Sequence, residues 1–515
     1  MAASEKCAVE VLIAGAGPTG LVLAIWLTRL GVRVRIVDKL IAPETTSRAI
    51  GVQARTLEFY RQLGIADKLV TSGHKSAAMN LWVSGRHQAR FPFAEMGADI
   101  SPFPFALVIS QDEHEKILTR HLAGLSIEIE RGTELLDFDC NHDCVSVRLK
   151  KSGGTVETCQ ATYLAGCDGV RSTVREHLKV GFSGGTYARK FYVADVHADG
   201  SATNGEINVA LDAADFLVIF PLGTDSHARL VGALGESAEN SGANQTWRDV
   251  NQSVIESLRL KIRRVNWFSS YRVHHRVADS FRKGRAFLLG DAAHIHSPVG
   301  GQGLNAGIGD AVNLAWKIHA VLRGRVDESL LETYEPERIA FARRLVTTTD
   351  RVFAGVTSSS FFDRLVRLKI IPCLLPRLFR FAAVRQFMFR TISQAAVNYR
   401  GSRLSAGRAG AVHGGDRLPW VKTEANDSAD NFAPLASLDW QVHIYGEAAP
   451  STRVVCAQKQ LPLHIFPWHA EMGRAGLRRD AVYLLRPDGY VAVANRDGDA
   501  AAIAAYLDTH HFKHE

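Results

Sequence analysis

Residues 9–27, VEVLIAGAGPTGLVLAIWL, constrain the fold of this chain more than any other stretch. A short apolar run, typical of a buried parallel strand, leads directly into Gly-x-Gly-x-x-Gly and then into a helix-like stretch that is apolar on nearly all sides. Gly15 permits a tight turn, Gly17 lets the backbone approach a pyrophosphate, and Gly20 lets strand and helix pack closely. The segment therefore predicts a nucleotide-binding βαβ unit with phosphate at the helix N-terminus.

A second strand, VRVRIV, follows and ends at Asp38, which lies 18 residues beyond Gly20. A carboxylate at this position can accept hydrogen bonds from ribose hydroxyls, although a solvated side chain at a strand end is the plain alternative. Strand, helix and terminal acid together favour nucleotide binding. The glycine pattern occurs once, which indicates a single resident dinucleotide.

Another glycine-rich stretch, LLGDAAHIHSPVGGQGLNAGIGDAVNL, covers residues 288–314. Asp291 follows a predicted strand and can bind a polyol hydroxyl. Gly301 and Gly303 let a backbone approach a flat ring, and a helix beginning near Leu304 would direct its N-terminus to the same place. We expect this stretch to join the first glycine turn in one site.

No metal site is predicted. His294 and His296 have the spacing of a possible ligand pair, but no third ligand is evident, so we interpret them as loop-structuring residues. Cys140 and Cys144 form the closest cysteine pair and have no matching Cys/His pair. An odd total of seven cysteines also argues against a disulfide framework.

The composition is that of a large globular protein: 515 residues, 46% of them hydrophobic. No apolar run reaches the ~18–20 residues of a membrane span, and the N-terminal residues lack the pattern of a secretory signal. We therefore expect a protein without a transmembrane segment, located in the cytoplasm.

Positive charge is concentrated in one segment. The net charge is +8, yet residues 351–403 alone hold ten basic residues against one acid, Asp363. A local excess of this kind does not indicate nucleic-acid binding. The segment could lie on an anionic surface, but we favour helices that pack an apolar face on the body and direct their arginines outward.

Short alternating segments at 75–105 and 186–275 predict an antiparallel sheet inserted into the nucleotide-binding domain. A further α/β domain is expected at 417–515, where strand-like segments precede a final helix.

Four motifs identify a family. GAGPTG, SRAIGVQARTLEFYRQLG, AGCDGVRSTVR and GDAAHIHSPVGGQGLNAGIGDAVNLAWK, in this order, resemble the single-component FAD-dependent aromatic hydroxylases with the p-hydroxybenzoate hydroxylase fold. The C-terminal domain resembles the thioredoxin-like domain of the phenol hydroxylase and polyketide or antibiotic hydroxylase branch. Its one cysteine, Cys456, excludes dithiol redox chemistry within that domain.

The resemblance implies an α/β fold with three parts. A Rossmann-like FAD-binding domain comprises residues 1–74, 106–185 and 276–403. A substrate-binding antiparallel sheet domain comprises 75–105 and 186–275, and a thioredoxin-like domain comprises 417–515.

The resemblance also implies a set of FAD-binding residues. The glycine turn would hold the pyrophosphate, Asp38 the adenosine ribose, Asp291 the ribityl chain, and the helix start near Leu304 the isoalloxazine. The full set is Gly15, Gly17, Pro18, Thr19, Gly20, Asp38, Lys39, Arg48, Gln111, Asp168, Asp291, Pro298, Gly301, Gly303, Leu304 and Asn305. No catalytic residue is predicted.

The implied activity is a monooxygenase that uses NADPH or NADH and O₂ to hydroxylate a phenolic or polycyclic aromatic substrate through a flavin hydroperoxide. The same fold could instead support epoxidation or a Baeyer–Villiger reaction on a polyketide or antibiotic. A third alternative is a non-catalytic FAD-binding partner protein. The predicted partners are the small aromatic substrate, O₂ and NAD(P)H, with a possible homodimer and no nucleic acid.

Overall fold

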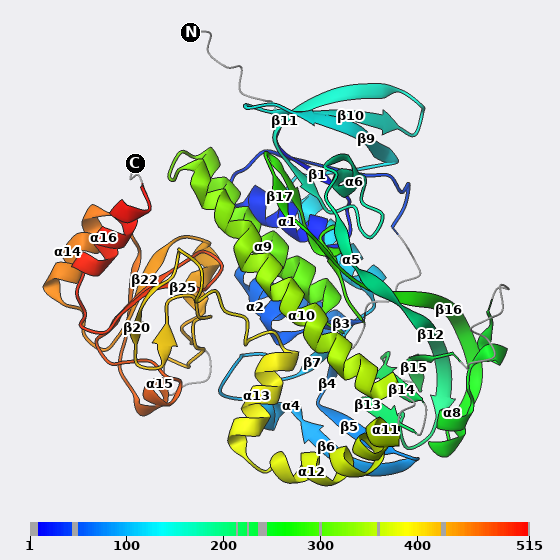
Figure 1. Ribbon diagram of the computed structural model, residues 1–515. Helices are drawn as coiled ribbons and strands as arrows, with labels where there is room; N and C mark the ends of the chain where they lie inside the picture. Colours follow the sequence, from blue (N-terminus) through cyan, green and yellow to red (C-terminus); the bar gives the residue numbers. More distant parts are fainter. Residues whose placement is uncertain are drawn as a thin grey trace.

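The computed structural model describes residues 9–43, 50–212, 215–223, 226–234, 245–297, 301–357, 361–423 and 429–512 (Figure 1). It confirms an α/β fold built on mixed sheets. Two eight-stranded sheets and a six-stranded sheet carry most of the strands, and the long helix α9 runs past the first of them (Figure 1).

The first sheet holds the predicted βαβ unit. Strand β1 (Val9–Ala14) lies between β2 (Val34–Asp38) and β11 (Val156–Gly166) and is parallel to both. Its central residues are fully buried, because helix α1 (Pro18–Arg29) covers the unit and itself packs against other helices. The remaining strands are β8 (Ile129–Arg131), β9 (Thr133–Cys140), β10 (Val145–Lys151), β17 (Arg282–Lys283) and β18 (Ala286–Leu288).

Helices surround this sheet. Both α5 (Gln111–Gly124) and α9 (Gly303–Leu322) pack against α1, which explains why α1 is apolar on nearly all sides. The short elements nearby are α2 (Ala54–Gln62), α3 (Ala66–Ser72), α6 (Thr173–His177), η2 (Gly290–Ala292) and η4 (Glu328–Thr333), with a small sheet of β3 (Gly51–Val52), β4 (His74–Ser76) and β7 (Ala106–Val108).

The second sheet is mostly antiparallel. Two 18-residue strands, β12 (Phe182–Asp199) and β16 (Lys261–Ala278), form its longest pair. Its other strands are β5 (Ala78–Val83), β6 (Arg86–Pro92), β13 (Ile207–Leu211), β14 (Phe216–Pro221), β15 (His227–Ala233) and β19 (His294–Ile295). Strands β5 and β13 are parallel, because the chain leaves and re-enters the sheet between them.

The two faces of this sheet have different neighbours. One face carries Phe191 and Phe216, whose apolar cluster also contains Ile50, Ala54 and Val108 from or beside the small sheet of β3 and β7 and the start of α2. The opposite face is covered by η1 (Trp247–Asp249) and α8 (Ser253–Ser257). The first face therefore lies against the small sheet and α2, and the second belongs to a separate core.

The third sheet lies in the C-terminal part of the chain. Its strands are β20 (Ala406–Ala409), β21 (Val412–His413), β22 (Gln441–Tyr445), β23 (Leu463–Phe466), β24 (Val482–Leu485) and β25 (Val491–Asn495). Helices α14 (Pro450–Gln458) and α16 (Ala501–Thr509) share one core with this sheet. On the other face, η6 (Ala433–Ser437) and α15 (Ala470–Arg474) complete a second core.

Helix α10 (Tyr334–Thr357) leads into a chain of shorter helices at one end of the molecule (Figure 1). These are α11 (Phe361–Leu365), a π-helical turn η5 (Val366–Ile370), α12 (Ile371–Leu378) and α13 (Ala382–Ile392). Helix α13 packs against α4 (Phe93–Gly97), and α12 packs against β6. Among the described helices, none is long and apolar enough to cross a membrane.

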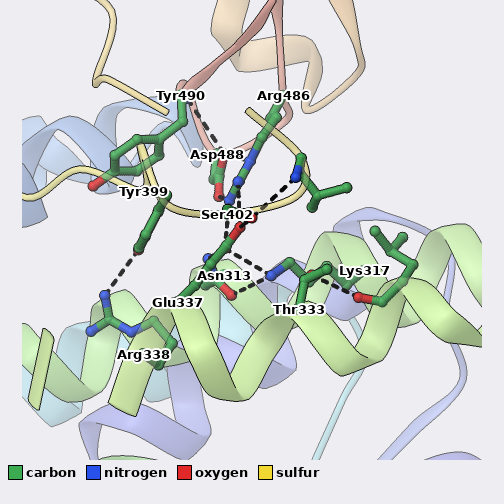
Figure 2. Close-up of polar contacts among 12 residues, drawn as sticks. Asn313, Lys317, Thr333, Glu337, Arg338, Tyr399, Ser402, Arg486, Asp488 and Tyr490 are labelled. Carbon is green, nitrogen blue, oxygen red and sulfur yellow. Dashed lines mark hydrogen bonds and ion pairs between the residues drawn. The ribbon is translucent and has the colours of Figure 1, made fainter. Parts of the chain in front are cut away.

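A buried ionic network ties the C-terminal sheet to α9 and α10 (Figure 2). Arg486 donates to both carboxylate oxygens of Glu337, at 2.9 and 3.1 Å, and also pairs with Asp488. The Lys317 ammonium donates to Glu337 Oε2 at 2.8 Å. All four side chains are at most 1% exposed, so each charge depends on the others for compensation.

We expect Arg486→Met to destabilise the protein by about 3–5 kcal/mol, because it leaves Glu337 and Asp488 buried with too few cationic partners. Urea denaturation of the variant and the wild type measures the difference. Arg474→Met is the matched control, since Arg474 pairs with Glu471 at the surface and its loss should cost less than about 1 kcal/mol. Equal effects of the two substitutions would contradict the prediction.

The stability should also decrease in mild acid. His114 is fully buried, its Nε2 atom shares a 2.7 Å hydrogen bond with the Tyr60 hydroxyl, and burial lowers its pKa to about 3. The unfolded chain therefore binds an extra proton as the pH falls from about 6.5 towards 3, which costs about 1.4 kcal/mol per pH unit. Thermal midpoints of the wild type and His114→Gln between pH 7 and pH 5 should show a shallower pH dependence for the variant.

Candidate active site

The glycine turn after β1 is held by close backbone contacts. Gly15 has a φ of +101°, and a Cβ atom there would lie 2.3 Å from the Cys167 carbonyl oxygen. A Cβ on Gly20 would lie 2.0 Å from the carbonyl oxygen of Gly15. A Cβ on Gly17 would meet nothing within 4 Å. The first and third glycines are thus required by packing, whereas the second leaves open space.

A cavity of about 320 Å³ opens beside this turn. It lies where the carboxyl ends of β1 and β2 meet the start of α5 and the segment after β11. Its lining includes Gly15, Gly17, Asp38, Lys39, Gln111, Arg131, Asp168, Gly169 and Arg171. Helix α1 begins at the turn with Pro18 at its first position and no side-chain cap, so backbone N–H groups remain for a ligand.

Asp38 forms part of the cavity wall and also supports the turn. Its carboxylate accepts hydrogen bonds from the backbone N–H of Ala16 at 2.7 Å and of Leu40 at 2.8 Å. The Arg131 guanidinium lies 3.5 Å away, at the end of β8. Sequence reasoning missed Arg131, because nothing in its local pattern distinguishes it from a surface arginine. Its Nη2 atom is buried without a partner, so it is a ready donor to a ligand.

The Asp168 carboxylate organises the segment after β11. It accepts hydrogen bonds from the Ser172 hydroxyl at 2.5 Å and from the Val174 N–H at 3.0 Å, and so supports the start of α6. Burial raises its pKa from the ordinary value. Arg175 is structural, since it donates to the carbonyl oxygens of Ala292 and Val170.

Asp291 differs from Asp38 and Asp168 in the partners of its carboxylate. Its side chain is accessible, and no described group forms a hydrogen bond or ion pair with its carboxylate. The surrounding protein nevertheless raises its pKa by withholding water from the charged form. An accessible carboxylate without a partner in a partly desolvated position is suited to bind the hydroxyl groups of a ligand.

Thr19 joins the two glycine-rich stretches. A Cβ on Gly290 would lie 2.7 Å from the Thr19 hydroxyl oxygen, and a Cβ on Gly307 would lie 2.4 Å from it. The Thr19 side chain therefore fills the space between α1, η2 and α9 that is open because residues 290 and 307 are glycines. This contact packs the two glycine-rich stretches against each other.

The start of α9 is held by side chains. Asn305 accepts a hydrogen bond from the Gln53 N–H at 2.9 Å and donates to the carbonyl oxygens of Gly51 and Gly301 at 3.0 and 2.8 Å. Gly301 has a φ of +61°, which forms the turn before Gly303. Leu304 is half-buried beside it.

The two histidines of this stretch, His294 and His296, form hydrogen bonds with other protein groups. His294 lies 2.7 Å from Asp310, which also accepts from the Gly290 N–H at 3.0 Å and from Arg338 at 2.6 Å. His296 donates to the Ser297 carbonyl, and burial lowers its pKa to about 4. Within the described ranges, no cluster of three potential metal ligands exists. Sequence reasoning missed Asp310 and Arg338, whose pairing links η2 to α9 and α10.

Gln111 begins α5, and its amide donates to Glu115 at 2.7 Å. Arg48 and Pro298 lie outside the described residues.

Comparison with known proteins identifies the class. Residues 8–349 match the family described as the FAD binding domain, and the chain belongs to this family. The residues present fit FAD: the cavity, the open position at Gly17 and the unpartnered Asp291 carboxylate all suit a dinucleotide with a polyol chain.

Individual relatives and solved structures give a more specific comparison. The 6-methylpretetramide 4-monooxygenase of Streptomyces rimosus is 33% identical and covers 98% of this chain and 93% of its own length. Pentachlorophenol 4-monooxygenase of Sphingobium chlorophenolicum is also 33% identical and covers 68% and 65%. The structure of OxyS anhydrotetracycline hydroxylase from Streptomyces rimosus superposes with a TM-score of 0.79 at 27% identity, covering 98% and 99%. The protein is an FAD-dependent, NAD(P)H-using monooxygenase of the aromatic hydroxylase type.

The glycine turn gives a matched pair of variants. Gly17→Ala should fold normally and bind FAD at least about tenfold more weakly, because its methyl group enters open space where the phosphates approach. Gly20→Ala should lose stability by several kcal/mol, because its methyl group overlaps the Gly15 carbonyl. FAD titration and thermal denaturation of the apoproteins separate the two effects. Normal FAD affinity in folded Gly17→Ala would contradict this assignment.

Asp291→Asn should weaken FAD binding without lowering the stability of the apoprotein, since the carboxylate has no described protein partner. Asp168→Asn should lower both, because Asp168 supports α6 through two hydrogen bonds. Isothermal titration with FAD and apoprotein denaturation are the measurements. A large loss of apoprotein stability in Asp291→Asn would show that its role is structural.

Proposed function

We propose that the substrate is a polycyclic aromatic compound of the polyketide type, hydroxylated on an electron-rich ring carbon. The observation that carries this proposal is a pair of matches over nearly the whole chain. The relative named for 6-methylpretetramide covers 98% of the chain, and the structure named as an anhydrotetracycline hydroxylase also covers 98%.

The proposed FAD site follows the geometry of the cavity. The turn at Gly15, Gly17, Pro18, Thr19 and Gly20 would receive the pyrophosphate. Asp38 would bind the ribose, with Arg131 as an additional donor.

The flavin end is supported by Asp291 and by the backbone from Gly301 to Asn305 at the start of α9. Asp168 would act through the segment that it organises, and Lys39 and Gln111 line the same cavity. The family resemblance adds Arg48 and Pro298.

Bound FAD would supply the redox chemistry with O₂, and the protein would provide orientation, charge stabilisation and exclusion of water. The first turn of α9 lacks a side-chain cap, so its N–H groups can stabilise negative charge on a ring placed there. The Asn305 side chain fixes this turn through three hydrogen bonds, and it would thereby set the distance between the turn and the ring.

The substrate would lie between the start of α9 and the sheet face that carries Phe191 and Phe216. Phe103 and Phe220 border the same apolar cluster. Trp82 belongs to the opposite face, where its indole N–H donates to Asn208 at 2.8 Å. The first face is therefore the better candidate for the aromatic wall of the pocket.

The domain limits and the thioredoxin-like character of residues 417–515 are part of this proposal. The observed strand order and the helices α14 and α16 on one face support it. Cys456 is buried on α14, and burial raises its pKa to about 11, which supports a structural role without thiol chemistry. A cytoplasmic location and a homodimer complete the proposal, and sedimentation velocity tests the latter.

The deciding experiment measures coenzyme oxidation by the purified flavoprotein with simple phenols, naphthoquinols and tetracyclic aromatic polyketides. We expect a tetracyclic compound to accelerate NAD(P)H oxidation most, with a product heavier by one oxygen atom. Preference for a simple phenol would overturn the proposed substrate class. NMR of the product separates ring hydroxylation from epoxidation and from Baeyer–Villiger insertion, and flavin without any coenzyme oxidation would indicate a non-catalytic protein.

A further inference from the structure

The helical segment 362–390 carries two apolar stripes. The inner stripe packs into the apolar cluster on the Phe191 face of the second sheet, as predicted for surface helices with one apolar face on the body. Its members are Leu368, Ile371, Leu375, Phe379 and Phe389. This stripe accounts for how the segment is attached to the body.

The outer stripe packs against none of the apolar clusters formed by the described residues. Ile370, Leu374 and Leu378 follow one another at four-residue spacing, and each is about two-fifths exposed or more. Three phenylalanines extend the stripe: Phe362, Phe381 and Phe387 are 67%, 64% and 70% exposed. Helix α12 has no fully buried residue at all. The packing of one apolar face on the body, as predicted, therefore leaves this outer stripe unexplained.

Basic side chains accompany the outer stripe. Residues 361–392 contain seven basic residues and one acid. Arg364, Lys369, Arg377 and Arg380 are exposed, and within the described part of the chain none lies within 4.0 Å of a carboxylate. We refer to the exposed stripe and these four cations as the basic apolar face.

The combination of exposed apolar side chains and exposed cations restricts which kind of partner can cover the basic apolar face. A second copy in a symmetric dimer would place the same cations opposite one another, which opposes association. An anionic bilayer offers an apolar interior for the phenylalanines and acidic headgroups for the arginines and the lysine. Protruding aromatic side chains beside cations on short helices also suit the interfacial region of a bilayer.

We propose that the basic apolar face docks the protein on an anionic phospholipid surface. The helices α11, α12 and α13 lie at one end of the molecule, beside β5 and β6, where a flat surface can reach them (Figure 1). Binding is peripheral and reversible: the aromatic side chains enter the interfacial region and the cations contact headgroup phosphates. The inference does not depend on the identity of the substrate.

The test uses the full-length holoenzyme and sedimentation with vesicles of phosphatidylcholine alone or mixed with phosphatidylglycerol. Two double variants remove one property each: Phe381→Ser with Phe387→Ser, and Arg377→Glu with Arg380→Glu. Matched controls are Val454→Ser, which removes an exposed apolar side chain on α14, and Arg474→Glu, which reverses an exposed charge on α15. Retained FAD and an unchanged thermal midpoint verify that each variant is folded.

We expect the wild type to bind the anionic vesicles, less so at high salt, and to bind neutral vesicles at least about tenfold more weakly. Each double variant should lose at least about tenfold in affinity for anionic vesicles, and the controls should not change. Absence of binding, equal binding to both vesicles, or wild-type binding by the double variants would overturn the proposal. So would a change in oligomeric state in the double variants, which would assign the face to a second copy.

Discussion

The close approach of backbone to backbone at the end of β1 is the constraint on which the rest of the site depends. Gly15 touches the Cys167 carbonyl and Gly20 touches Gly15, so strand and helix are closer than any side chain would allow. This closeness brings the Ala16 N–H to the Asp38 carboxylate and opens the first turn of α1 to a cavity. It also lets Thr19 contact the glycines of η2 and α9, so that two distant stretches of sequence lie side by side.

Local pattern was enough to predict the elements that carry the site. The βαβ unit, the strand before Asp291 and the helix from Gly303 follow from glycine spacing and apolar runs, which act over a few residues. The roles of Asn305 and Arg131 could not be predicted in this way. Their partners lie up to about 250 residues away, and only the folded chain brings them together.

Whether a charged residue is buried is even harder to predict from local sequence. Arg486 and Arg377 look alike in sequence, yet the first is enclosed in an ion network and the second is exposed beside apolar side chains. Whether a charge is buried depends on which elements pack over it, and α10 and the C-terminal sheet meet only in the tertiary structure. In the basic segment, the packed inner stripe is as predicted, whereas the exposed outer stripe could not be predicted, because helical periodicity does not indicate how many sides of a helix other elements cover.

The ion network has a consequence for how such chains can be recombined. Arg486 and Asp488 come from the last domain, whereas Glu337 and Lys317 come from helices of the flavoprotein body. Because a buried charge without its partner is costly, a recombined chain has to keep these four residues together. A chimera that takes its last domain from a relative should therefore fold only if α9 and α10 come from the same relative. Replacing all four residues together by apolar ones is the alternative.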